Sequence, residues 1–168
     1  MSDAKDSRMM IFHVPTDTAV LASIAGIALR HSHLDYILRL TIKSLADVPI
    51  SVAMDATASA GSAVLRKRIA KLARRRLGEG PDLIKLQALL KRCRRASEKR
   101  NDYIHKIWAQ DVVGGEPKVQ TDDGGWQLPP TIKELQELEI ELISLASTIN
   151  RERLEGFLAE AMAAKRAL

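Results

Sequence analysis

Apolar residues recur at steps of three and four along the first third of the chain, the spacing of one face of an α-helix. Thr16 or Asp17 can cap the start of this helix, and Pro49 ends it. The pattern predicts one amphipathic helix of roughly eight turns. That length is unusual in a globular protein, so a break near Gly26 or at residues 31–33 is an alternative. The stripe comprises Val20, Ile24, Ile27, Leu34, Leu38 and Leu45, with His31 and Thr41 in its two vacant places.

Two more helices are predicted in the middle of the chain. A mixed connection over residues 47–60, with room for one short helical turn, leads to a helix over residues 62–77. Gly78 ends that helix because glycine adopts the left-handed conformation common beyond a helix C-terminus. Pro81 suits the first position of the next helix, whose inward stripe continues to about Ile107.

Turn-forming residues then interrupt the helical pattern over residues 109–130. Within this insert, residues 118–121 and 126–128 are candidates for a small β-hairpin. Thr131 and Glu134 form a capping-box pattern that opens a last helix, expected to run to about residue 164. The apolar stripe of that helix changes phase at residues 150–153.

Composition favours an all-α fold, because leucine, alanine and isoleucine are abundant while aromatic residues make up 4% of the chain. A chain of 168 residues is long enough for one well-packed domain. We expect a flexible lead-in over residues 1–15 and a single helical domain over residues 16–168, built as an up-down bundle of four to five helices with the turn-rich insert before the last one.

Positive charge is concentrated in the middle of the chain. Residues 59–106 contain 15 Lys and Arg against four acids, a net charge of +11, whereas the rest of the chain carries −6. A basic face raises the local concentration of polyanions such as RNA, although a solvated helix surface explains the same pattern.

Several classes of protein find no support in the sequence. Cys93 is the single cysteine, so no intramolecular disulfide can form, and a reducing, cytoplasmic location is expected. No apolar run is long enough to span a membrane or to act as a signal peptide. The P-loop, GxGxxG, GxSxG and HExxH motifs are missing, so no cofactor is expected.

The residues best suited to chemistry lie at the end of the third helix. Asn101 and His105 are four residues apart and share a helix face, and the long side chain of Arg100 can lean toward that face. A histidine can transfer protons near neutral pH, and an arginine can stabilise charge on a phosphate. This set suits metal-independent cleavage of RNA.

At these residues the chain resembles the HEPN superfamily, whose hallmark is an arginine, a polar residue and, four to six residues after the arginine, a histidine. Arg100-Asn101-Asp102-Tyr103-Ile104-His105 follows this pattern, and the helix order over residues 17–160 is also similar. The sequence departs at Lys106, where these families often have glycine.

The resemblance implies a homodimeric bundle that acts as a metal-independent endoribonuclease, the toxin of a toxin–antitoxin or phage-defence system beside an antitoxin protein. Arg100 would bind the scissile phosphate, Asn101 would orient the site and His105 would act as general acid or base on the ribose 2′-hydroxyl, leaving a 2′,3′-cyclic phosphate.

Further residues have weaker claims to a role in the site. His31, at a stripe position four residues before Asp35, either forms a buried pair with that carboxylate or helps to orient Arg100 or His105. A metal site at His31, His33 and Asp35 is disfavoured, because a fourth ligand is missing and only two of the three share a face. Additional candidates for RNA contact are Asp102, Tyr103 and Lys106, for which salt bridging and packing are the alternatives.

Two other functions are consistent with the same residues. The bundle is then either a non-catalytic interaction module that binds a partner protein or a nucleotide, or a helical nucleic-acid-binding protein without turnover. In the first case the Arg100 and His105 motif only holds the helix end.

Overall fold

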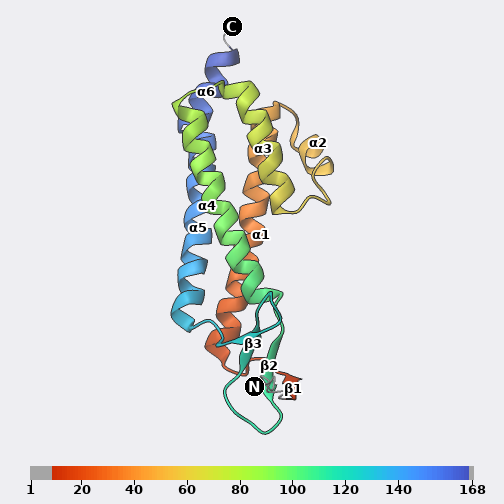
Figure 1. Ribbon diagram of the computed structural model, residues 1–168. Helices are drawn as coiled ribbons and strands as arrows, with labels where there is room; N and C mark the ends of the chain where they lie inside the picture. The colour runs from red at the N-terminus through yellow and green to blue at the C-terminus, as the bar shows by residue number, and fades with distance from the viewer. Residues whose placement is uncertain (1–8, 167–168) are drawn as a thin grey trace, which may run out of the picture.

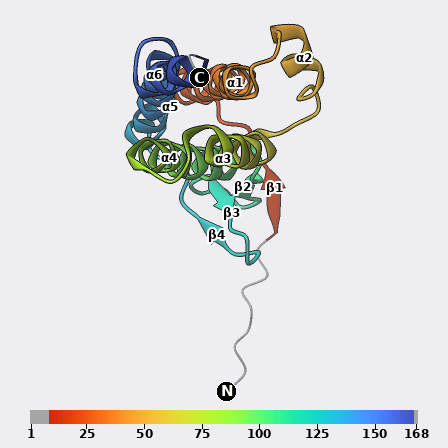
Figure 2. The same cartoon turned by 90° about the horizontal axis from the view of Figure 1, so that it is seen from above.

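Four long helices pack side by side and supply most of the hydrophobic core (Figure 1). The computed structural model describes residues 9–166. Helices α1 and α4 each pack against both α3 and α5, so the four form a bundle, seen from above in Figure 2. Their bounds are Thr18–Ala46 for α1, Ser62–Leu77 for α3, Pro81–Ile104 for α4 and Ile132–Leu154 for α5. Within the described residues, no helix combines the length and the apolar character needed to cross a membrane.

Helix α1 runs unbroken for 29 residues. The Asp17 carboxylate accepts hydrogen bonds from two backbone N–H groups of the first turn, and Asp47 ends the helix in the left-handed conformation, with φ 55°. The prediction of one long helix is confirmed, and neither of the alternative breaks occurs. His31 and Thr41, the two polar residues in the apolar stripe, are both buried, and the Thr41 hydroxyl donates to the Ile37 carbonyl oxygen at 2.9 Å. The stripe therefore faces the core along its whole length.

The bundle does not alternate strictly up and down as expected. Ser62 at the start of α3 contacts Asp35 in the middle of α1, and Arg76 near the end of α3 donates to the carbonyl oxygen of Ala46. Helices α1 and α3 are thus parallel. The connection between them, which contains the short helix α2 (Ile50–Asp55), runs back outside the bundle (Figures 1 and 2). This return places the start of α3 beside the middle of α1.

The last predicted helix is in fact two. The capping box at Thr131 and Glu134 is present and opens α5. Helix α5 ends at Leu154, and a separate helix, α6 (Phe157–Arg166), follows. The prediction of one helix to about residue 164 was therefore wrong, and the break lies just after the change of phase predicted at residues 150–153.

A small antiparallel sheet at one end of the bundle corrects the all-α prediction to a predominantly helical fold. The expected hairpin is confirmed, because β3 pairs with β4. Two strands were not predicted: β1 lies in the supposed lead-in and pairs with β2. The expectation of a flexible lead-in over residues 1–15 fails at residues 10–12, while residues 1–8 lie outside the described residues. The strands, in sheet order, are β1 (Met10–Phe12), β2 (Trp108–Asp111), β3 (Lys118–Gln120) and β4 (Trp126–Gln127).

The pairing of β1 with β2 gives a first prediction. The backbone N–H of His13 donates to the Trp108 carbonyl oxygen at 2.9 Å. His13→Pro removes this donor and is expected to lower the free energy of unfolding by about 1–3 kcal/mol. His13→Ala keeps the N–H and is the control, and urea denaturation measures both. Equal losses in the two variants would show that this hydrogen bond contributes nothing to stability.

Candidate active site

The chain leaves α4 at His105, earlier than the predicted end near Ile107. His105 keeps a right-handed conformation, with φ −102° and ψ −10°, and its backbone N–H donates to the Asn101 carbonyl oxygen at 3.0 Å. No residue from His105 to Trp108 has a positive φ, and β2 begins at Trp108. Glycine is therefore not required after the histidine, and Lys106 is compatible with this exit from the helix.

Arg100 brings the three predicted catalytic residues together. Its Nη1 donates to Asn101 Oδ1 at 3.1 Å and contacts His105 Nε2 at 2.5 Å. A guanidinium can only donate, so Nε2 must accept. The arginine side chain leans toward the face of Asn101, as the sequence predicted.

The trio lies at the surface. Asn101 and His105 are exposed, whereas Arg100 is half-buried. The Nε atom of Arg100 is buried and has no hydrogen-bond partner among the described residues. A partly desolvated cation attracts a nearby anion more strongly than one in bulk water. Arg100 is therefore suited to hold a phosphate group.

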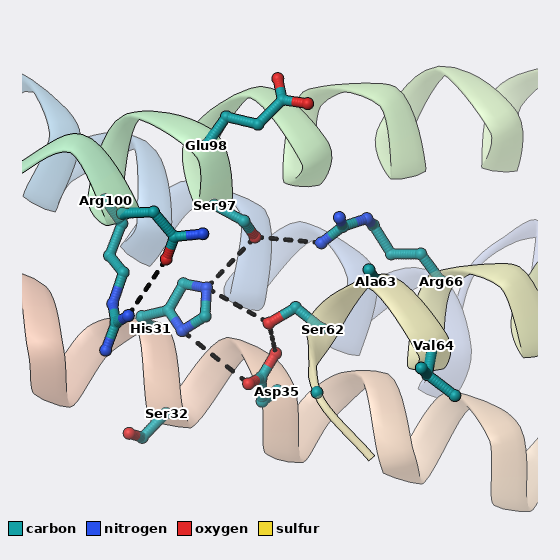
Figure 3. Close-up of a pocket in the computed structure, with 12 residues that line it drawn as sticks. His31, Ser32, Asp35, Ser62, Ala63, Val64, Arg66, Ser97, Glu98 and Arg100 are labelled. Carbon is teal, nitrogen blue, oxygen red and sulfur yellow. Dashed lines mark hydrogen bonds and ion pairs between the residues drawn. The ribbon is translucent and has the colours of Figure 1, made fainter. Parts of the chain in front are cut away.

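A cavity of about 580 Å³ opens beside Arg100, between the middle of α1, the start of α3 and α4 (Figure 3). Arg100 and Asn101 line one end of it, and His105 adjoins it through its contact with Arg100. His31 and Asp35, the two residues of α1 with weaker claims to a role in the site, also line it. The other polar side chains of the lining are Ser32, Ser62, Arg66, Ser97 and Glu98.

His31 is the centre of a hydrogen-bonded network in this cavity. Its Nε2 lies 3.1 Å from Ser97 Oγ and 3.3 Å from Ser62 Oγ, and its Nδ1 lies 3.8 Å from Asp35 Oδ2. The Ser62 hydroxyl donates to the other Asp35 oxygen at 2.6 Å. The predicted pairing of His31 with Asp35 is thus confirmed. Within the described residues, neither side chain has a hydrogen bond to Arg100 or His105.

Burial sets the protonation of His31. Loss of hydration lowers the pKa of the imidazole below its ordinary value of 6.5. The Asp35 carboxylate opposes this shift and raises the pKa, while Arg100 and Arg66 lower it further. His31 is therefore a neutral hydrogen-bonding group at neutral pH.

Three residues of the network, Ser62, Arg66 and Ser97, were not predicted from the sequence. The Arg66 Nη1 donates to Ser97 Oγ at 3.0 Å, and the Ser97 hydroxyl donates to the Cys93 carbonyl oxygen at 2.9 Å. Ser97 is 5% exposed and lies four residues after Cys93, so its place beside the apolar stripe was an available signal. Arg66 gave none, because it is one of seven cations in the same helix.

The remaining candidates lie outside the cavity. Lys106 forms salt bridges with Asp102 at 3.2 Å and Asp122 at 3.5 Å, which confirms the alternative of salt bridging. The Tyr103 ring packs against the core, with the Lys99 ammonium 5.8 Å from its centre. These residues therefore support the end of α4.

Two features bear on other chemistry at this site. In the described part of the chain, no group of three or more His, Cys, Asp or Glu side chains gathers at a spacing suited to a metal ion. Cys93 is buried, and burial raises the pKa of its thiol to about 12. The thiol is thus protonated and packs as a small core residue.

Comparison with known proteins leaves the function to be argued from this site. No protein-family model matches the chain, and no curated protein and no solved structure matches it.

Proposed function

We propose that the protein is a metal-independent endoribonuclease of HEPN type. The observation that carries the proposal is the contact of one guanidinium, that of Arg100, with both Asn101 and His105 at the rim of a polar cavity. Proton transfer and charge stabilisation are the two demands of phosphodiester cleavage. An imidazole and a guanidinium meet both.

The resting contact indicates how each group acts. A phosphate bound beside Arg100 offers the guanidinium stronger acceptors than an imidazole nitrogen does. His105 Nε2 is then free to take the proton of the ribose 2′-hydroxyl, whose oxygen attacks the phosphorus. The bond to the 5′-oxygen breaks, that oxygen leaves as a hydroxyl by taking up the proton that the imidazolium returns through solvent, and a 2′,3′-cyclic phosphate remains. Arg100 stabilises the charge on the phosphorane, and the Asn101 amide holds the guanidinium in place.

The proposal extends to the setting of the enzyme. Two copies pair so that both Arg100 and His105 sets line one cleft, as the family resemblance implies. The enzyme then acts in the cytoplasm as the toxin of a toxin–antitoxin or phage-defence system, and an antitoxin protein restrains it.

The test is cleavage of single-stranded RNA in the presence of EDTA. Wild-type protein is expected to produce fragments with 2′,3′-cyclic phosphate ends, and the His105→Ala variant is expected to leave the RNA intact. Circular dichroism confirms that the variant is folded. Equal cleavage by the two proteins, or none by either, would refute the assignment.

The same contact also fits a second function. Mutual bonding of Arg100, Asn101 and His105 can simply hold the end of α4 in a non-catalytic module that binds a partner protein or a nucleotide. In that case His105→Ala lowers thermal stability, and wild-type protein shows no turnover of RNA.

A further inference from the structure

A second hollow, a groove of about 600 Å³, runs between α3 and α4. Its floor is apolar, formed by Ala63, Ala70 and Leu90, and no Asp or Glu lines it. Its walls carry five cations: Arg66, Lys67, Arg74, Lys91 and Arg94.

The groove continues the candidate active site. Ala63 and Arg66 line both hollows. The bond from Arg66 to Ser97 sets antiparallel α3 and α4 in register. From that point the groove cations follow α3 forward to Arg74, a rise of about 12 Å at ~1.5 Å per residue. On α4 they run backward to Lys91, away from Arg100. The cations thus form one track that begins at the active site.

Little in the structure neutralises this track. Lys67, Arg74 and Lys91 are exposed, and among the described residues none of them has an ion pair or a side-chain hydrogen bond. Arg94 pairs with Glu98 at 3.2 Å, but both side chains are more than half exposed, so the pair is weak. Helix α3 itself contains seven Lys and Arg and no acid. Such a surface favours a polyanion.

We propose that this groove, which we call the α3–α4 track, binds the backbone phosphates of a single-stranded RNA whose scissile phosphate lies at Arg100. The proposal rests on the proposed function. Packed helices lie about 8–10 Å apart, so the groove between them is too narrow for a duplex. No aromatic residue lines the track, so bases have no stacking platform there. The track therefore recognises the backbone and adds little sequence preference.

The test measures RNA binding apart from cleavage, in the His105→Ala background. Fluorescence anisotropy follows a labelled single strand of about twelve nucleotides, within the range of known site sizes, over a series of salt concentrations. The track variant carries Lys67→Gln, Arg74→Gln and Lys91→Gln. A matched control carries Lys71→Gln, Lys133→Gln and Arg151→Gln, which remove the same residue types and the same charge outside the track.

The track variant is expected to bind on the order of 100-fold more weakly at about 0.1 M salt, because three phosphate contacts are lost. For the same reason the negative slope of log affinity against log salt is expected to become shallower by about 2. The control variant is expected to keep the slope. Circular dichroism melts verify that both variants fold.

Other outcomes would overturn the proposal. Equal weakening in the two variants would mean that net charge alone attracts RNA, and absence of binding in the His105→Ala background would mean that there is no track. Displacement of RNA by polyglutamate of equal charge at equal concentration would mean an acidic protein occupant. A further measurement is RNA cleavage by the three track substitutions in a protein that keeps His105. If this variant cleaves RNA as fast as the wild type does, the proposal of an RNA-binding track is wrong and the proposal of ribonuclease activity is retained. If the track binds RNA as predicted but wild-type protein does not cleave it, the proposal of ribonuclease activity is wrong.

Discussion

Replacing Arg100 and His105 together is expected to lower the rate of RNA cleavage by little more than replacing His105 alone. The His105→Ala change is expected to cost about 10²- to 10⁴-fold, the usual contribution of a general acid or base. Arg100→Ala is expected to lower the cleavage rate by about 10²- to 10³-fold. It removes the charge that stabilises the phosphorane and the guanidinium that contacts the His105 imidazole. Two residues that act as one unit give losses that do not multiply.

The structural reason is the direct contact between the two side chains. Arg100 Nη1 lies 2.5 Å from His105 Nε2, so each residue positions the other. Arg100→Lys keeps the charge but loses the planar fork that reaches Asn101 and His105 together, so it is expected to recover only part of the activity. Single-turnover cleavage with wild type, His105→Ala, Arg100→Ala and the double alanine variant gives the coupling directly.

Arg95→Ala is the matched control for the Arg100 variants. Arg95 is an exposed arginine of α4, and it lies on the side of the helix that adjoins α5. The control is expected to cleave at the wild-type rate. A double variant whose loss equals the product of the two single losses would mean that Arg100 and His105 act independently, contrary to the proposed unit.

The helices of the bundle were readable in the sequence because each is coded locally. The capping residues Asp17 and Thr131 and the apolar stripes set their starts and inner faces. Strand β1 was not readable, since three residues have no periodicity of their own. It forms because β2, about 100 residues further along the chain, offers an open edge. That pairing is a long-range fact that a local pattern does not contain.

The residues of the site also fall into two groups, those that local spacing brings together and those that only the packing of distant helices brings together. Arg100 and His105 lie within one helix end, so spacing alone brings them together. Ser62 and Ser97 meet His31, and Arg66 meets Ser97, only because the return through α2 sets the start of α3 against α1 and α4. All seven cations of α3 look alike in sequence, and packing decides that Arg66 alone donates to Ser97.

Acidification is expected to destabilise the protein through His31. Its pKa is lowered in the folded state, so below the ordinary value of 6.5 the unfolded chain binds more protons than the folded chain does. The free energy of unfolding therefore rises with pH in that range, and the stability contributed by neutral His31 is lost as the pH falls from 6.5 through the folded pKa. The groups that face the imidazole are Asp35, Arg66 and Arg100, and the two arginines oppose a second positive charge there.

His31→Gln tests this cause, because glutamine offers a polar group to Ser97 and Ser62 but does not titrate. Urea denaturation from pH about 7.5 to about 5.5 is expected to show a smaller loss of stability in His31→Gln than in wild type. The control is His33→Gln, at an exposed position of the same helix, and it should follow wild type. At pH about 7.5, His31→Ala is expected to cost about 2–4 kcal/mol, because it opens a cavity and leaves buried hydroxyls without their partner. Parallel pH curves for wild type and His31→Gln would place the sensitivity in other groups. A difference in the free energy of unfolding between His31→Gln and wild type that appears only at acid pH would show that the uncharged imidazole of His31 stabilises the fold around the cavity beside Arg100.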